Sequence, residues 1–206
     1  MWHAKAKGAY AIDSTEAYDN ALEAWSILLN SGWTLNAFSG YWGNVGGEGG
    51  YNPWRWQSDK VQPSGGSPWT NKGYGLTQFT PASKYIDAAM GYKGYAPNFS
   101  DRTGNASDGL AQVLFLNDRA DYYPTSRYPE TYTEYKVSLE SPEYLASVWL
   151  YNYERPADPA STEATRKRNA RYWFDKLNGV EPPVPPPIGG GTLPFWFMAA
   201  MSKRRW

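Results

Sequence analysis

The chain has 206 residues, enough for one domain of ordinary size with appendages, and its formal net charge is zero. It has no Cys and one His, His3, which excludes cysteine nucleophiles, disulfides, thiolate zinc sites and histidine-based metal sites. A Ser/His/Asp arrangement would have to recruit this residue from a terminus that we expect to be mobile. Carboxylates remain for acid–base chemistry, as in glycosidases, and we expect neither a metal nor a cofactor.

The aromatic content is high, with 11 Trp and 17 Tyr, and many of them stand beside Gly, Asn, Asp or Pro. Flat amphipathic rings stack on the apolar faces of sugars while their polar edges reach hydroxyl groups, so one interpretation is a carbohydrate ligand. The other is a Tyr-rich surface that binds a protein partner. The basic residues are scattered rather than clustered, and nucleic acid is therefore not an expected partner.

The first elements along the chain are helical. No apolar run near the N-terminus is long enough for a secretory signal peptide, and we expect none. Ser14 or Thr15 can cap a helix whose apolar face continues to Asn30, with Gly32 as its C-terminal stop. The spacing of that face is typical of a helix that packs on a core.

A second helix is predicted to begin near Thr34 and to end at Glu48, because apolar residues recur at helical spacing: Leu35, Phe38, Trp42 and Val45. Glu48 falls on the flank of this stripe, so we expect its carboxylate to lie half under apolar cover. Burial raises the pKa of a carboxyl, and a Glu protonated near neutral pH can donate its proton to a leaving oxygen. The alternative is a glycine-rich turn that contains a solvated Glu.

Loops follow. Residues 63–75 are dense in Ser, Gly and Pro, which predicts a binding loop or a small irregular sheet over a cleft. Gln78 stands between apolar neighbours and is suited to bind an N-acetyl group or a sugar hydroxyl, although it could equally satisfy backbone groups. Residues 82–90 are predicted to form a helix.

Three further helices and a loop are predicted in the second half. One helix runs from about Ser107 towards Asp121, and residues 122–135 are assigned to a loop. Ser141 as N-cap and Pro142 open the next helix, which ends at residues 154–156. The last helix, 162–177, is basic. Its cationic residues are interpreted as a solvated face: Arg166, Lys167, Arg168 and Arg171.

The composition changes beyond Gly179, so we place a folded domain at residues 1–179. Residues 180–192 form a Pro-rich and Gly-rich linker, a stiff spacer followed by a hinge. Residues 193–206 are apolar and then basic, and their apolar run is far shorter than the roughly 20 residues of a membrane span. We expect this tail to act as a docking peptide or an interfacial anchor outside the fold.

Three motifs stand in order along the chain: Gly43-Asn44-x-x-x-Glu48 followed by Tyr51-Asn52-Pro53, then Gly73-Tyr74-Gly75-Leu76-Thr77-Gln78, and last Tyr151-Asn152-Tyr153-Glu154-Arg155-Pro156. In this order they resemble the phage tail-type lysozyme family, part of a superfamily that includes goose-type lysozymes and lytic transglycosylases. The resemblance implies a mainly α, two-lobed fold of the α+β lysozyme-like type, with a small irregular or β region over a peptidoglycan cleft.

The resemblance also implies a reaction, cleavage of the β-1,4 bond between N-acetylmuramic acid and N-acetylglucosamine. It carries the catalytic acid onto Glu48. Four further positions become candidate substrate-binding residues: Tyr74, Gln78, Tyr151 and Asn52. One position departs from the family pattern, because Gly49 follows Glu48 where related sequences usually have Ser. A hydrogen bond to the acid or the substrate is then missing.

The second catalytic group stays open. An inverting hydrolase needs a base that activates water, whereas a lytic transglycosylase uses the muramoyl 6-hydroxyl and can work with one carboxylate. Asp59 is the candidate base, in a loop that could fold over the cleft, and its alternative role is that of a turn or cap acid. Glu154 could approach the cleft from the third motif, but we interpret Glu-Arg-Pro at a helix end as an ion pair that fixes the terminus.

The sequence thus predicts a wall-degrading glycosidase of a bacteriophage, carried on the virion tail for host-wall penetration or made in the infected cell for lysis. A lytic transglycosylase and a non-catalytic wall-binding virion protein are the alternatives. The expected partners are peptidoglycan glycan strands and, through residues 193–206, phage tail proteins or a membrane.

Overall fold

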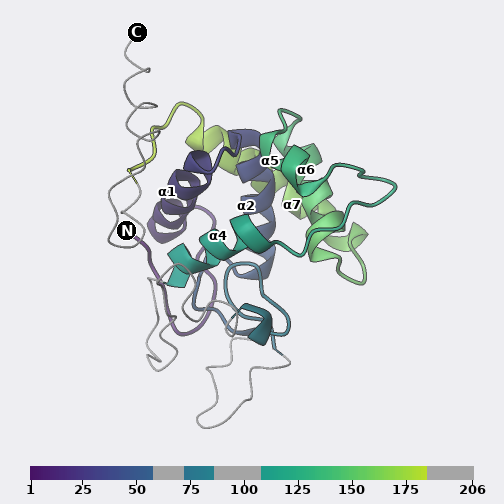
Figure 1. Cartoon of the computed structure of the whole chain (residues 1–206). Helices are drawn as coiled ribbons and strands as arrows, with labels where there is room; N and C mark the ends of the chain where they lie inside the picture. The colour runs from purple at the N-terminus through teal and green to yellow at the C-terminus, as the bar shows by residue number, and fades with distance from the viewer. Residues whose placement is uncertain (58–71, 86–107, 185–206) are drawn as a thin grey trace.

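The computed structural model describes residues 1–57, 72–85 and 108–184 (Figure 1). The predicted tail, most of the predicted linker and most of the predicted helix at 82–90 lie outside these residues. The described elements are helical: α1 (Thr15–Asn30), α2 (Leu35–Glu48), α4 (Asp108–Arg119), α5 (Tyr132–Val137), α6 (Pro142–Trp149), a π-helical turn η2 (Leu150–Glu154) and α7 (Ala160–Leu177). Within them, no helix is long and apolar enough to cross a bilayer.

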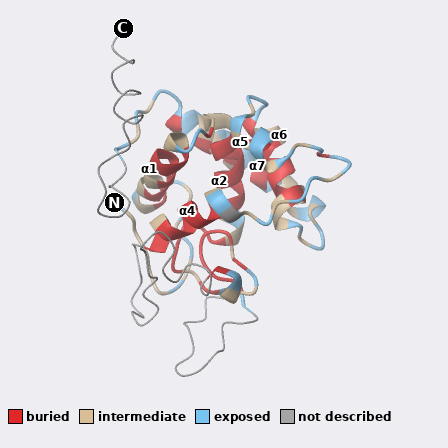
Figure 2. Ribbon diagram, in the orientation of Figure 1, coloured by how far each residue is buried: buried red, intermediate tan, exposed pale blue. Residues whose placement is uncertain are grey.

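Helix α2 lies at the centre of the larger lobe, with α1 on one side and α6 and α7 on the other (Figure 1). Most of α2 is buried, as its red colour in Figure 2 shows. The core around it contains a dense set of aromatic rings. Trp42 stacks on Phe38 with centroids 5.6 Å apart, and Tyr41 lies 5.0 Å from the ring of Trp149. Ring pairs of this kind add to the stabilisation that comes from area burial.

Two glycines of α2 allow its neighbours to approach closely. A Cβ at Gly43 would lie 2.7 Å from the backbone nitrogen of Ala170 in α7, and one at Gly40 would lie 2.8 Å from Leu145 in α6. The missing side chains therefore let two helix backbones pack directly on α2. This close packing fixes the end of α2, where Glu48 lies.

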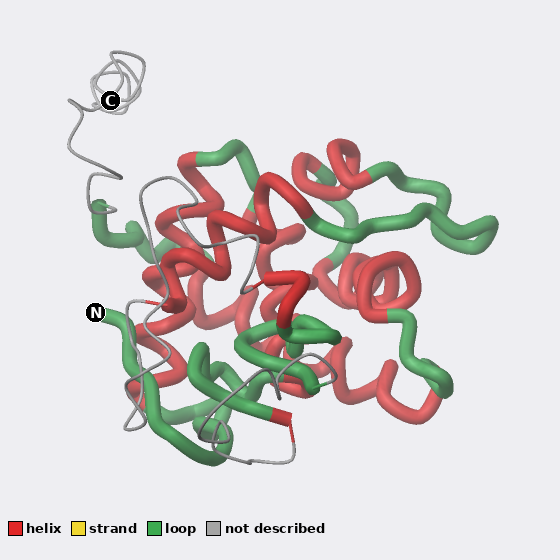
Figure 3. Tube along the Cα trace, turned by 60° about the horizontal axis from the view of Figure 1, so that its bottom comes forward, coloured by secondary structure: helices red, strands yellow, loops and turns green. Residues whose placement is uncertain are grey.

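The smaller lobe is irregular and consists of residues 49–57 and 72–85 packed on α4 (Figure 3). Tyr74 forms isolated antiparallel bridges with Trp56 and Phe79. A second buried cluster holds the lobe together: Trp54, Trp56, Tyr74, Phe79, Ala82, Tyr85, Ala111 and Phe115. The predicted fold class, mainly α with a small irregular or β region, is confirmed.

A buried carboxylate, Asp108 at the start of α4, organises this lobe. It accepts hydrogen bonds from the hydroxyl groups of Tyr74 and Tyr85, the latter at 2.6 Å, and from Nε2 of Gln112 at 2.8 Å. Gln112 in turn accepts the backbone N–H of Leu76 at 2.7 Å. The second motif is thus attached to α4 through Asp108 and Gln112.

The titration of Asp108 predicts a pH dependence of stability. Burial raises its pKa from 3.8 to about 6, although the hydrogen bonds from its neighbours lower it in part. The folded state then binds the proton more tightly than the unfolded state, so this contribution is complete below pH 3.8 and is lost as the pH rises through 6. At low pH, Asp108 contributes about 3 kcal/mol to the free energy of unfolding in this way. Urea unfolding from pH 4 to 7 should show a shallower loss of stability in Asp108→Asn than in the wild type. If the free energy of unfolding falls equally with pH in the two proteins, Asp108 is not the group responsible.

The N-terminal segment is packed against the domain, which corrects the expectation of a mobile terminus. Nε2 of His3 lies 2.8 Å from the carboxylate of Asp19 in α1. The side chain of Asn20 donates to the carbonyl oxygen atoms of His3 and Tyr51, and Asn52 donates to those of Lys5 and Gly8. His3 is therefore part of the scaffold.

Two local features differ from the sequence prediction. Helix α5 begins within the segment assigned to a loop and continues beyond it to Val137, and it starts with a capping box between Thr131 and Glu134. The helix opened by Ser141 ends near the predicted residue, but its last turn is η2, where the N–H of Arg155 donates to the carbonyl of Leu150. Arg155 has a left-handed backbone with φ of 48°, which ends the helix.

Candidate active site

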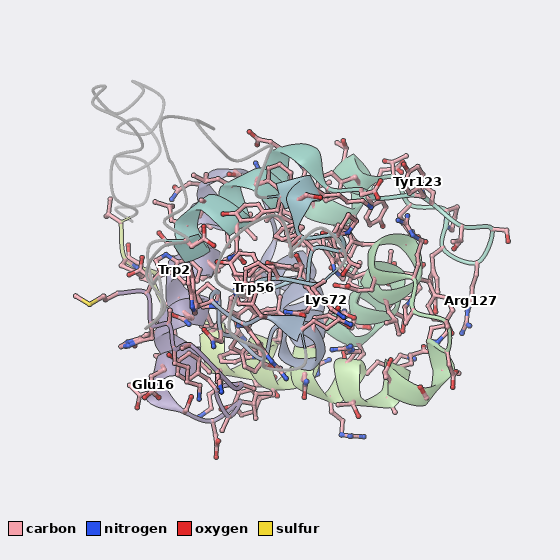
Figure 4. The ribbon with its side chains drawn as sticks, turned by 90° about the horizontal axis from the view of Figure 1, so that it is seen from below. Trp2, Glu16, Trp56, Lys72, Tyr123 and Arg127 are labelled. Atoms are coloured by element: carbon pink, nitrogen blue, oxygen red, sulfur yellow. The ribbon has the colours of Figure 1, made fainter. Side chains whose placement is uncertain are left out.

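All three motifs meet in a cleft of about 760 Å³ between the two lobes. Glu48 lines it from the end of α2, Gln78 from the second motif and residues 153–156 from the third. Figure 4 views the molecule from below and shows Trp56 and Lys72 of the smaller lobe at the centre of this face, with Tyr123 and Arg127 on the loop at its edge. Three segments distant in sequence thus form one site.

Glu48 is the last residue of α2, and its side chain is 24% exposed. Its carboxylate accepts a hydrogen bond of 2.5 Å from Nη2 of Arg166 in α7, while Nη1 of Arg166 donates to the carbonyl of Asn44 at 2.6 Å. The guanidinium thus also complements the negative end of the helix dipole. The predicted apolar cover is replaced by an ion pair whose cation is 5% exposed.

The guanidinium of Arg166 occupies the space that a side chain at Gly47 would fill. A Cβ at this position would lie 1.2 Å from Nη1 of Arg166, so any side chain there would displace the cation. A side chain in this turn of α2 would therefore shift the guanidinium from its present contacts with Glu48 and the Asn44 carbonyl.

The interpretation of α7 as carrying a solvated cationic face is wrong for Arg166. Arg171 is exposed and Lys167 is half-buried, and they pair with Glu143 and Glu163 respectively, as a solvated face predicts. Arg166 instead stands on the buried face of the helix, which it shares with Ala170, Trp173 and Leu177. These four residues recur at helical spacing, so a cation at an apolar position was the signal for this residue.

Glu154 from the third motif also lines the cleft and is half-buried. Nε1 of Trp149 donates to its carboxyl at 3.1 Å. Desolvation at this position, and then the negative charge of Glu48, raise the pKa of Glu154 to about 8. The interpretation of Glu154 and Arg155 as an ion pair is not what the structure shows, because Arg155 pairs with Asp121 at 3.4 Å.

Of the other predicted site residues, Gln78 lies in the cleft. Its backbone is left-handed, with φ of 49°, and its side-chain amide donates to the carbonyl groups of Arg55 and Gly75. Among the described residues its amide oxygen has no hydrogen-bond donor. This oxygen is therefore available to accept a hydrogen bond.

Tyr74, Asn52 and Tyr151 are placed elsewhere. Tyr74 and Asn52 are fully buried. Tyr74 donates to Asp108 inside the smaller lobe, and Asn52 donates to the N-terminal segment, so both are scaffold residues. The ring of Tyr151 lies under the guanidinium of Arg127, 4.8 Å from its centroid, and does not line the cleft. Asp59, the candidate base, lies outside the described residues.

The structure also explains Gly49. A Cβ at this position would lie 2.5 Å from the carbonyl oxygen atoms of Gly75 and Leu76, and the N–H of Gly49 donates to Leu76 at 3.0 Å. The second motif occupies the space that a serine side chain would take. Within the described parts of the chain, no group of three carboxylate or imidazole side chains could hold a metal ion.

Comparison with known proteins gives a consistent result. The sequence model of the family described as phage tail lysozyme matches residues 19–177. Morphogenesis protein 1 of Bacillus phage B103 is 35% identical over 178 residues, which cover 84% of this chain and 43% of that protein. The chain thus spans less than half the length of this relative. Because the family match extends over most of its length and includes all three motifs, this chain belongs to the phage tail lysozyme family.

Proposed function

We propose that this chain is a bacteriophage glycosidase that cleaves the β-1,4 bond between N-acetylmuramic acid and N-acetylglucosamine in peptidoglycan, with Glu48 as general acid. The observation that supports this most strongly is the position of Glu48, a partly exposed carboxylate at the end of a rigid helix in an open cleft. Catalytic groups are most effective where packed elements hold them in place, and α2 is packed on nearly all sides.

The cleft suits a polar polymer. Besides Glu48 it is lined by hydrogen-bonding side chains that include Gln57, Thr77 and Gln78, and by rings that include Phe79 and Tyr153. Amide and hydroxyl groups bind N-acetyl groups and sugar hydroxyls, and rings pack against sugar faces. Gln78, with its free amide oxygen, is our candidate for the substrate amide N–H.

We further propose that the protein acts at the host wall from a virion. The similarity to a phage morphogenesis protein supports a role in a phage particle, and residues 193–206 are the candidate contact with other tail proteins or with a membrane. Asp59 stays a candidate for the base of an inverting hydrolase. The end group of the products separates the two reactions, because a reducing end indicates hydrolysis and a 1,6-anhydromuramoyl end indicates transglycosylation.

The test compares clearance of purified cell walls by the wild type and by Glu48→Gln. Glutamine keeps the shape and can still accept the hydrogen bond of Arg166, but it has no proton to donate. We expect a loss on the order of 10²-fold or more, as for removal of a general acid. Glu143→Gln, which changes an exposed pair with Arg171, is the matched control and should clear walls normally.

Two outcomes would contradict this function. If wild type and Glu48→Gln clear walls equally, the chemistry does not depend on Glu48. If neither clears walls but both bind them, the chain is a wall-binding protein that has the fold without the reaction. Thermal unfolding of each variant shows whether a loss of clearance has a structural cause.

A further inference from the structure

Three charged side chains meet in the cleft, and the function proposed above gives none of them a role. Lys84 comes from the smaller lobe, Asp121 follows α4, and Arg155 follows η2 in the larger lobe. Nζ of Lys84 lies 3.6 Å from Oδ2 of Asp121, and Nη2 of Arg155 lies 3.4 Å from the same oxygen. Lys84 and Arg155 are the two cationic residues in the described lining of the cleft. Cations from two lobes thus converge on one carboxylate.

Asp121 leaves both cations able to bind a further anion. Both distances exceed the roughly 2.7–2.9 Å of a hydrogen bond between charged groups. An ammonium and a guanidinium each carry several donor hydrogens, and one shared oxygen does not use them all. The three side chains are between 39% and 57% exposed, so a ligand in the cleft can reach them. Ion pairs with this exposure contribute little to folding, and a ligand can therefore replace them at low cost.

Arg155 is held in place for such a ligand. Its guanidinium stacks on the ring of Tyr123, 4.6 Å from the centroid, at the edge of the face that Figure 4 shows. Its Nη1 donates to the carbonyl of Asn152 at 3.3 Å. These contacts fix the plane of the guanidinium, so less conformational entropy is lost when an anion binds.

The proposed substrate carries carboxylates at regular intervals. Each N-acetylmuramic acid residue of peptidoglycan has a lactyl group, which ends either in a carboxylate or in an amide bond to a peptide with carboxylates of its own. A glycan of N-acetylglucosamine alone has neither. Cations that line a cleft raise the affinity and the association rate for an anionic polymer but not for a neutral one. The charge of the cleft thus complements one class of glycan.

We propose that Lys84 and Arg155 form a binding site for the carboxylates on muramoyl residues, and that this site selects an anionic wall glycan over a neutral one. Asp121 is the internal anion that holds the two cations before the substrate carboxylate replaces it. The inference rests on the proposed function and deepens it, because it names the feature of the substrate that the cleft recognises. The lactyl group and the attached peptide are two sources of the same chemistry.

The experiment measures the Kd of soluble glycan strands, and every protein carries Glu48→Gln so that the strands stay intact. The strands are used with their peptides and after enzymatic removal of the peptides, which frees the lactyl carboxylates. Each form is also used after conversion of its carboxyl groups into amides, which keeps the glycan and removes the charge. Native strands should bind about tenfold more tightly than amidated ones at low salt. The difference should vanish in 1 M salt, where the Debye length is about 3 Å.

Three substitutions predict two opposite effects. Lys84→Gln and Arg155→Asn should each weaken binding of native strands about fivefold and leave binding of amidated strands unchanged. Asparagine suits position 155 because it tolerates the left-handed backbone, with φ of 48°. Asp121→Asn should strengthen binding about threefold, because the internal anion no longer competes. Arg168→Gln is the matched control, since it removes an exposed cation of α7 that does not line the cleft, and it should leave the Kd unchanged.

The strand that the variants affect identifies the source of the carboxylate. A loss of affinity confined to peptide-free strands indicates the lactyl group, a loss confined to peptide-bearing strands indicates the peptide, and a loss with both shows that the site accepts either. Equal affinity for native and amidated strands would overturn the proposal. Weaker binding in Asp121→Asn would also overturn it, because the three charges would then act as a brace between the lobes and not as a ligand site.

Cleavage by the wild type separates this inference from the function itself. If the wild type cleaves peptidoglycan but amidation leaves the affinity unchanged, the function stands and this inference fails. If the wild type cleaves no strand while the affinities follow the predicted order, the carboxylate site stands and the reaction fails. Each substitution should shift the Tm by less than about 3 °C, because exposed ion pairs stabilise little, and thermal unfolding checks this.

Discussion

Replacement of Arg166 by Met should destabilise the protein by about 3 kcal/mol, because removal of one partner from a buried ion pair leaves the other charge without compensation. The value is at the lower end of the usual range, since water in the cleft can reach the Glu48 carboxylate, whose side chain is 24% exposed. The carbonyl of Asn44 would also lose its bond from the guanidinium. Urea unfolding at pH 7 measures the change.

The same substitution should reduce wall cleavage on the order of 10²-fold, because Glu48, the general acid that we propose, would no longer be held in place to meet the leaving oxygen. Arg168→Met is the matched control, since Arg168 lies on the same helix but is exposed and bonds only to Thr165 among the described residues. It should change stability by less than about 0.5 kcal/mol. If the two variants behave alike, the ion pair of Arg166 and Glu48 contributes nothing measurable.

Gly43→Ala should be the second severe substitution, with a cost of about 3 kcal/mol, at the upper end of the range for overpacking. The added Cβ would lie 2.7 Å from the nitrogen of Ala170 and 2.8 Å from the carbonyl oxygen of Arg166. Both are backbone atoms, which cannot rotate away, so α7 would have to move from α2. Such a movement also shifts Arg166 relative to Glu48, and we expect activity to fall with stability.

Whether Gly43→Ala lowers or raises the stability shows whether the added methyl group meets a steric conflict. An alanine in place of a helical glycine without a steric conflict would stabilise the protein by roughly 0.5–1 kcal/mol. A stability equal to or above that of the wild type in urea unfolding would therefore show that α7 can accommodate the methyl group. The direction of the shift decides between the two cases without a further variant.

Much of the larger lobe could be predicted from the sequence. The helices α1, α2 and α7 follow from apolar spacing and from caps such as Ser14 and Thr34, which the structure confirms. Helix α5 could have been found from Thr131 and Glu134, a capping-box signal that lies in a segment broken by proline and rich in polar residues. Local signals were thus sufficient for helices, including one that was missed.

The roles of polar residues were harder to predict, because burial depends on partners far along the chain. Tyr74 was expected in the cleft by resemblance, but its hydroxyl bonds to Asp108, which no local pattern connects with it. Arg166 was assigned to the solvated face because neighbouring residues are cationic, and only its place on the apolar stripe indicated burial. A single sequence shows the spacing of such residues but not which side chain satisfies a buried charge.

The absent side chain at Gly47 links position 47 to position 166, although the two are far apart in the sequence. A relative with a side chain at position 47 must place the guanidinium of position 166 differently, and a relative that loses this arginine is released from the requirement for glycine. We therefore expect these positions to be exchanged together during divergence. Recombination between the gene segments for α2 and α7 would be least tolerated where it joins a side chain at position 47 to an arginine at position 166.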